Sequence, residues 1–293
     1  MTVWVKKTSK LNILLGVLFL ALVPNLAAAY VVGGPGAAFQ VSSQGWAWEG
    51  GAFVTEFRTA LEDPIYFGPG GVVEETIVTV DITPNAAGLA GVDGFIAPWW
   101  RRDESAPFDA DVVNFFLGGG DLWLLQDSGP NQPGTGSVLG RDGIGDLLGI
   151  PTVGQTAITP VNGIAPLFDG PFGIANNVGQ GGGEEGFLST ADVLAANGTI
   201  IGTNTENQVI AAAWGANQFA PGAGALIIVA DIDMFTTQAS FYPLDDNGIF
   251  TLNAFAFLSG SEEPIPTVPV PPTGLLLLLG LGLTGIVNKR RTR

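Results

Sequence analysis

Four consecutive residues have the side chains that a polysaccharide site needs. The run Trp99, Trp100, Arg101 and Arg102 directly follows a predicted strand at residues 93–97. Exposed tryptophan stacks well on sugar rings, and arginine pairs with the carboxylates of uronic acids. The run therefore predicts a polysaccharide-binding site. The alternative is that one tryptophan packs in the core while the arginines pair with neighbouring acidic residues.

A pair of aspartates offers a second kind of chemistry. Asp231 and Asp233 come just after a predicted strand at residues 225–230. In open parallel sheets the carboxyl edge is where ligands bind, and two carboxylates at i and i+2 could help backbone oxygens to hold Ca²⁺. The alternative is that both aspartates cap a helix or bond to a loop. No other cofactor is expected.

The composition removes several classes of enzyme. The chain contains neither cysteine nor histidine, which excludes Ser-His-Asp and Cys-His catalysis and nearly all zinc sites. Acid-base chemistry is left to carboxylates, tyrosine and arginine. Asp127, Ser128 and Gly129 match the D-S-G of aspartic proteases, but the motif occurs once and that chemistry needs two such aspartates. A turn that closes a strand is the simpler interpretation.

Two pairs of glutamates could supply a glycosidase with carboxylates. They are Glu74 with Glu75 and Glu184 with Glu185. Adjacent residues of a strand point to opposite faces, so that neither pair is itself a catalytic pair. A carboxylate-dependent hydrolase would instead require acidic side chains from different strand ends to share one cleft and to have raised pKa values.

The elements that position these residues are of two alternating kinds. Short apolar runs predict buried strands at residues 38–42, 76–82, 93–97, 121–125, 209–214 and 225–230. Apolar periodicity predicts helices at residues 52–61, 109–117 and 247–258, the last with a turn and N-cap at residues 245–248. This alternation predicts a three-layer α/β fold with a mostly parallel central sheet and helices on both faces. Residues 129–186 are expected to be rich in loops.

The N-terminus carries an export pattern. Three lysines precede an apolar run at residues 11–23, and the small residues Ala27 and Ala29 precede Tyr30. This pattern predicts a secretory signal peptide at residues 1–29, exported by the Sec translocon and cleaved by signal peptidase before Tyr30. The alternative is an uncleaved N-terminal anchor.

The C-terminus combines a linker, a proline motif, an apolar run and a basic end. Residues 261–272 are rich in Glu and Pro, and residues 274–287 are apolar. A membrane explains the apolar run and the basic end together, because the run enters lipid and the basic cluster stays on the cytoplasmic side. The motif consists of Val268, Pro269, Val270 and Pro271, and the basic end includes Lys289, Arg290 and Arg291.

Residues 268–293 resemble the PEP-CTERM family of bacterial sorting signals, in its VPxP variant. The apolar run of residues 274–287 is shorter than the roughly 20 residues that span a bilayer as a helix, which favours a processed signal over a permanent anchor. The resemblance implies recognition by a membrane transpeptidase of the exosortase type. It also implies a final place on the cell surface or in the extracellular matrix, often with exopolysaccharide.

Residues 30–260 are expected to form a single domain. The exported part keeps four arginines against 27 acidic residues, a net charge of −23, which argues against a nucleic-acid partner because phosphate binding needs a basic surface. Five segments resemble the non-catalytic branches of the class I glutamine amidotransferase-like α/β domains. These segments are residues 92–98, 109–127, 142–150, 224–235 and 253–260.

The resemblance implies the fold and argues against the activity. Catalytic members need a cysteine after the central strand and a histidine base, whereas the corresponding turn here begins with Gln126 and Asp127. The sequence thus predicts a non-enzymatic, exported surface or matrix protein. The alternatives are a carboxylate-dependent extracellular glycan hydrolase and a plain membrane-anchored scaffold.

Overall fold

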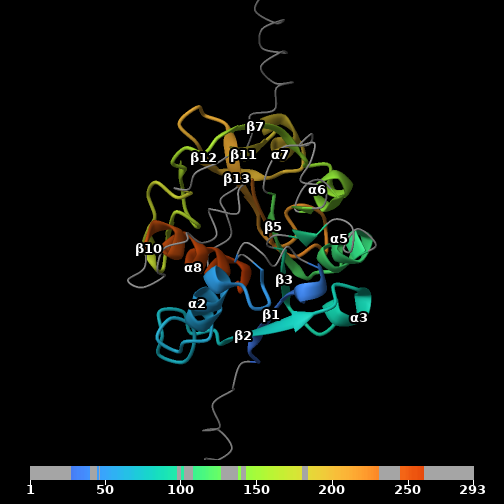
Figure 1. Ribbon diagram of the computed structural model, residues 1–293, viewed down its shortest axis with the longest axis vertical. Helices are drawn as coiled ribbons and strands as arrows, with labels where there is room; N and C mark the ends of the chain where they lie inside the picture. Colours follow the sequence, from blue (N-terminus) through green and yellow to red (C-terminus); the bar gives the residue numbers. More distant parts are fainter. Residues whose placement is uncertain are drawn as a thin grey trace, which may run out of the picture.

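One mixed sheet of ten strands forms the centre of the molecule, and helices cover it on both sides (Figure 1). The structure is a computed structural model that describes residues 28–39, 45, 47–97, 100–101, 108–126, 138–139, 143–179, 184–230 and 245–260. The predicted α/β class is confirmed.

Half of the sheet is parallel. Its strands lie in the order β2, β1, β3, β5, β14, and each pairs in parallel with the next. β3, β5 and β14 are buried along almost their whole length, as expected for strands covered on both faces. The bounds are β1 Tyr30–Pro35, β2 Ile77–Ile82, β3 Gly94–Ala97, β5 Asp121–Leu125 and β14 Leu226–Val229.

The other half of the sheet is antiparallel. β13 pairs antiparallel with β14, and its other partners are β11 and β12. Beyond them, β7 pairs with β11 and β8 pairs with β12, both antiparallel. The strand predicted at residues 209–214 is confirmed as β13. Its antiparallel pairing was not predicted, because β13 is buried at every position and lacks the alternation that marks a half-exposed strand. The bounds are β7 Thr152–Ala157, β8 Asn162–Gly163, β11 Glu184–Leu188, β12 Thr199–Thr203 and β13 Val209–Trp214.

The helices divide between the two faces of the sheet. Figure 1 shows α2 (Ala52–Leu61) and α8 (Asp246–Leu258) on one side, and α3 (Ala86–Leu89), α5 (Asp109–Leu117) and α6 (Gly143–Leu148) on the other. The helices predicted at residues 52–61 and 109–117 have these bounds. The remaining short elements are η1 Ala37–Phe39, β4 Trp100–Arg101, β6 Val138–Leu139, β9 Asp169–Gly170, β10 Gly173–Ile174 and α7 Thr190–Ala195.

The predicted N-cap of the last helix is confirmed. The carboxylate of Asp245 accepts a hydrogen bond of 2.8 Å from the backbone N–H of Gly248, which satisfies one of the unpaired donors of the first turn. The helix predicted at residues 247–258 is buried on nearly all sides.

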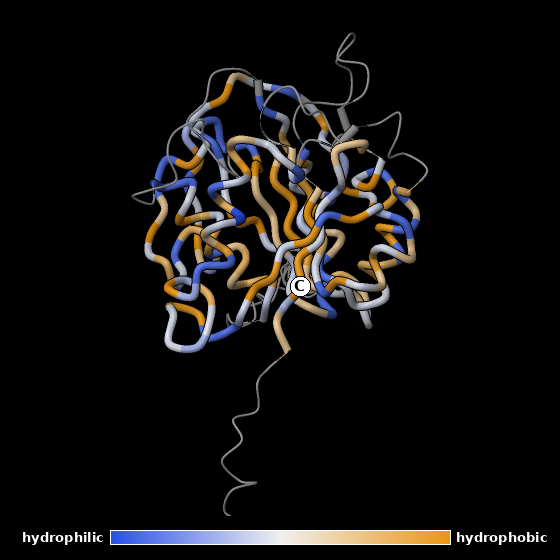
Figure 2. The backbone as a smooth tube through the Cα atoms, turned by 60° about the horizontal axis from the view of Figure 1, so that its bottom comes forward, coloured by the Kyte–Doolittle hydropathy of each residue, from blue (hydrophilic) through white to orange (hydrophobic). Residues whose placement is uncertain are grey.

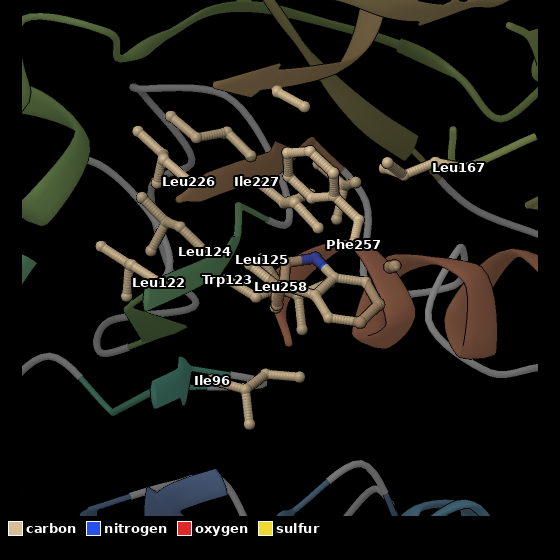
Figure 3. Close-up of a cluster of buried hydrophobic side chains, with 14 of the residues drawn as sticks. Ile96, Leu122, Trp123, Leu124, Leu125, Leu167, Leu226, Ile227, Phe257 and Leu258 are labelled. Carbon is tan, nitrogen blue, oxygen red and sulfur yellow. The ribbon is translucent and has the colours of Figure 1, made fainter. Parts of the chain in front are cut away.

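The core has one layer on each side of the parallel strands. Apolar segments run through the centre of the molecule (Figure 2). In β5, Trp123 points toward α8, while Leu122 and Leu124 point to the opposite face (Figure 3), following the alternation of a strand. The ring of Trp123 lies 5.2 Å from that of Phe255 in α8, which lies 5.2 Å from Phe57 in α2. Aromatic contacts therefore join the sheet to both helices of that face.

The strand predicted at residues 38–42 is wrong at its start, because residues 37–39 form the short helix η1; residues 40–42 lie outside the described residues. The first described strand is instead β1, which starts at Tyr30. The glycines of β1 resemble a turn in the sequence, but they serve close packing. A Cβ atom on Gly34 would lie 2.2 Å from the ring of Trp48. Residues 129–186, predicted to be rich in loops, also contain β7 and the start of β11.

The predicted targeting segments lie mostly outside the described residues. Within the part of the chain that the structure describes, no helix is both long and apolar enough to cross a membrane. The apolar runs at residues 11–23 and 274–287 fall outside that part, so both remain predictions.

Candidate functional site

The two ligand sites predicted from the sequence fall largely outside the described residues. Trp99, Arg102, Asp231 and Asp233 are not among them. Trp100 and Arg101 form the short strand β4, which follows β3 and pairs antiparallel with β6. The polysaccharide site and the Ca²⁺ site therefore remain predictions. Among the described residues, no group of three or more acidic side chains has the spacing to hold a metal ion.

The carboxyl end of the central strand β5 carries a buried amide. The backbone N–H of Gln126 donates to the carbonyl of Val229 at 2.7 Å, and its side chain has no exposed surface. Its amide packs so closely on α6 that a Cβ on Gly145 would lie 2.2 Å from Nε2. Neither amide atom has a hydrogen-bond partner among the described residues. Gln126 thus places a neutral, non-nucleophilic amide at the carboxyl end of β5.

A buried carboxyl group lies on the antiparallel half of the sheet. Glu185 of β11 is fully buried, and Asn204 Nδ2 donates to its Oε1 at 3.0 Å. Burial raises the pKa of Glu185, and the hydrogen bond from Asn204 opposes the shift. The Oε2 atom has no partner among the described residues. Glu74 and Glu75, the other pair of adjacent glutamates, line a separate cavity of about 430 Å³ at the end of α8.

A larger cavity opens at the amino edge of the parallel strands, at the other end of β5 from Gln126. It has a volume of about 680 Å³ and lies between α3, α5 and the first residues of β1 and β5. Asp93, Asp111 and Asp121 line it together with Tyr30, and Phe115 contributes to its apolar wall. Sequence reasoning selected only Tyr30 of these residues, and for another reason. The available signal was that Asp93 and Asp121 each stand at the amino end of a predicted strand.

Tyr30 ties the parallel strands together at this edge. Its hydroxyl donates to Asp121 Oδ2 at 2.8 Å, and its backbone N–H donates to the carbonyl of Thr76 at 2.8 Å. Asp121 Oδ1 in turn accepts from the backbone N–H of Ala225 at 2.7 Å. The phenol passes over β3 at Gly94, where a Cβ would lie 2.4 Å from the hydroxyl oxygen. One side chain therefore links β1 to the start of β5 across β3.

Burial dominates the electrostatics of this pair. It raises the pKa of Asp121 from the ordinary 3.8 to about 6, although hydrogen bonds from Ala225 and Tyr30 oppose the shift. Burial also raises the pKa of Tyr30 well above 10.0, with the Asp121 carboxylate adding to the effect. The phenol therefore stays protonated at neutral pH and donates to Asp121.

The other two carboxylates are tied to the backbone. Asp93 Oδ2 accepts from the backbone N–H of Val31 at 2.8 Å, and Asp111 Oδ2 accepts from that of Ala86 at 3.1 Å. Asp111 thereby supports the first turn of α3 rather than acting only on its own helix. The cavity thus brings together three carboxyl groups that are all held by hydrogen bonds of the fold, and the pKa of one of them, Asp121, is about 6. It could accept hydrogen bonds from a polar ligand, and Asp121 could act as a general acid.

Comparisons with known proteins give only distant likenesses. No family model matches the chain, and no curated protein matches it significantly. Among solved structures, the mmIFT52 N-terminal domain is 14% identical with a TM-score of 0.43, and the match covers 65% of this chain and 87% of that one. Such values support no statement about function.

Two glycosidases are similarly distant. The exo-β-1,4-mannosidase Op5Man5 from Opitutaceae bacterium strain TAV5 is 12% identical with a TM-score of 0.43, over 78% of this chain and 36% of that one. A catalytic mutant of Gan42B, a GH42 β-galactosidase from G. stearothermophilus, is 12% identical with a TM-score of 0.44. That match covers 81% of this chain and 31% of that one. This chain thus corresponds to about a third of either glycosidase.

Proposed function

We propose that this protein is a non-enzymatic, exported bacterial surface or extracellular-matrix protein, sorted through its C-terminal PEP-CTERM-like signal. The observation that supports the proposal most directly is the residue at the end of β5. At the turn where an amidotransferase-like domain needs a nucleophile, the chain has the buried amide of Gln126, and it contains no cysteine or histidine. The domain keeps the α/β framework without the groups that the chemistry requires.

The start of the first described strand supports the export part of the proposal. β1 begins at Tyr30, the residue that follows the predicted cleavage site. The partners of this proposal are the Sec translocon, signal peptidase and an exosortase-type transpeptidase.

Polysaccharide is the extracellular partner that we propose. The exported part carries four arginines against 27 acidic residues, and two of those arginines are Arg101 and Arg102 beside Trp99 and Trp100. Sugar stacking on tryptophan and pairing of arginine with uronate carboxylates would recognise such a polymer.

Replacing the proline motif in the native host tests the sorting proposal. Alanine at Val268, Pro269, Val270 and Pro271 should leave the protein in the membrane fraction with its tail intact, while the native chain loses the tail. A matched control replaces Pro264 and Pro266 of the same linker, which keeps the loss of two prolines but leaves the motif unchanged. A motif variant that is processed and released like the native chain would contradict the proposal. A native chain that also keeps its tail would favour the plain anchor.

A carboxylate-dependent glycan hydrolase is the second candidate. It is favoured by Asp121, whose pKa of about 6 suits a general acid and which shares one cavity with Asp93 and Asp111. The test is release of reducing ends from the host exopolysaccharide by the native protein and by Asp121→Asn. Turnover that disappears in a folded Asp121→Asn variant would establish the hydrolase and overturn the non-enzymatic proposal.

A further inference from the structure

The predicted cleavage site stands directly against the folded domain. Tyr30 is the first residue of β1, and its backbone N–H already bonds to Thr76 of the segment that leads into β2. The next N–H, that of Val31, donates to Asp93 at 2.8 Å. No spacer residue separates the Ala29–Tyr30 bond from the first strand of the sheet.

Tyr30 is also anchored by its side chain. Its hydroxyl donates to Asp121 at 2.8 Å, and its ring lies over Gly94, the only residue type that leaves room there. Lifting Tyr30 from the sheet would leave the carbonyl of Thr76 and the carboxyl of Asp121 without these donors. Such losses oppose local opening of the strand.

Signal peptidase must hold the peptide on both sides of the bond that it hydrolyses. The residue on the carboxyl side of that bond would be Tyr30, whose backbone is already paired in the sheet. A backbone that is engaged in a sheet cannot at the same time lie in the extended cleft of a protease. The folded domain and the peptidase therefore compete for the same residue.

We propose that Tyr30 makes removal of the signal peptide depend on the folding state. The Ala29–Tyr30 bond is open to the peptidase only before β1 joins the sheet, and an uncleaved chain that has folded is protected. In the reaction, water adds across the bond and gives the carboxylate of Ala29 and the ammonium of Tyr30. This inference rests on the proposed export of the chain through a cleaved signal peptide.

The product of cleavage fits the fold that then forms. Tyr30 N and Val31 N are separated by at most one residue rise of about 3.6 Å, and Val31 N lies 2.8 Å from Asp93 Oδ2. The new ammonium group is therefore no more than roughly 6.4 Å from a carboxylate, and it keeps its hydrogen bond to Thr76. Opposite charges at this separation attract each other, so that the mature N-terminus stabilises the closed edge.

Timed addition of the peptidase tests the proposal on the full chain. The complete protein is synthesised in a cell-free system with detergent micelles, and purified signal peptidase is added either during synthesis or after the chain has folded. Cleavage before Tyr30 is followed by gel shift and by N-terminal sequencing. We expect cleavage of the folded chain to be at least about tenfold slower, because β1 must first open.

Two glycine variants separate the anchoring of Tyr30 from sequence recognition. Gly94→Ala places a Cβ 2.4 Å from the tyrosine hydroxyl, whereas Gly91→Ala brings its Cβ no closer than 3.6 Å to any neighbour. Both variants leave the residues around the cleaved bond unchanged. Gly94→Ala should restore fast cleavage after folding, and Gly91→Ala should behave like the native chain. If Gly94→Ala does not fold, Tyr30→Phe serves in its place, because it removes only the hydroxyl. It should give a smaller increase in the cleavage rate of the folded chain.

The outcomes distinguish this inference from the function on which it rests. Equal cleavage rates during synthesis and after folding, both before Tyr30, would overturn the inference and leave the export proposal intact. Absence of cleavage before Tyr30 even during synthesis would overturn both.

Discussion

Replacing Asp121 by asparagine should change how the stability of the domain depends on pH. Burial raises the pKa of this carboxyl group from 3.8 to about 6 in the folded state. A carboxyl group with a raised folded pKa binds its proton more tightly in the folded chain than in the unfolded chain. Its contribution to stability is therefore fully present below about pH 4 and is lost as the pH rises through about 6. Asparagine has nearly the same shape but does not titrate.

The size of the effect follows from the shift. The pKa of Asp121 rises from 3.8 to about 6, and one pKa unit corresponds to about 1.36 kcal/mol. The upper bound on the change in unfolding free energy is therefore about 3 kcal/mol. Because Asp121 is partly exposed and solvent screens its charge, we expect about half of that bound, near 1.5 kcal/mol. Relative to the native domain, Asp121→Asn should thus gain about 1.5 kcal/mol of unfolding free energy between pH 4 and pH 8.

Urea unfolding of residues 30–260, followed by tryptophan fluorescence at pH 4, 5, 6, 7 and 8, measures this difference. Asp146→Asn is the matched control, because it removes an exposed carboxylate on α6. The control should shift the unfolding free energy little at any pH. If the difference between native and Asp121→Asn proteins is the same at pH 4 and pH 8, burial does not control this carboxyl group and the reasoning is refuted.

Three further predictions concern other parts of the chain. Gln126→Met removes two buried amide atoms that lack partners among the described residues, and should raise the unfolding free energy by about 1 to 2 kcal/mol in urea titrations. A decrease would show that the amide is bonded. Asp245→Ala removes the N-cap bond to Gly248 and should lower stability by about 1 kcal/mol, seen as a lower melting temperature; an unchanged value would contradict that role. Deleting the basic end from Lys289 onward should leave unprocessed precursor in the membrane fraction, measured by fractionation and immunoblotting; normal processing would count against a sorting signal.

Most of the parallel half could be predicted, because β2, β3, β5 and β14 are short apolar runs, whereas the glycines of β1 hid that strand. β5 and α5 have the predicted bounds, since strong apolar patterning and Gly118 to Gly120 fix their ends. In the antiparallel half, β13 has the predicted bounds, but β7 and β11 could not be predicted in the same way. β7 contains Gly154 and polar residues, and its position depends on pairing with β11 rather than on its own sequence.

The cavity at the amino edge shows why site prediction from sequence was less complete. Asp93, Asp111 and Asp121 are 28 residues apart at most and carry no recognisable motif. They share a cavity only because β3 and β5 pair in parallel and α5 packs beside them. Tyr30 was selected as the residue after the cleavage site, but its bond to Asp121 spans 91 residues and depends on the register of three strands.

The central claim is that an exported domain is delivered between two targeting segments, and the ends of the mature chain test it most directly. Intact mass spectrometry with terminal peptide mapping on the protein from its native host gives both ends. The account predicts a chain that begins at Tyr30 and ends near Val268 to Pro271, either free or with an added group. A chain that still ends in Arg293 at steady state would contradict the sorting proposal and leave a membrane-anchored domain.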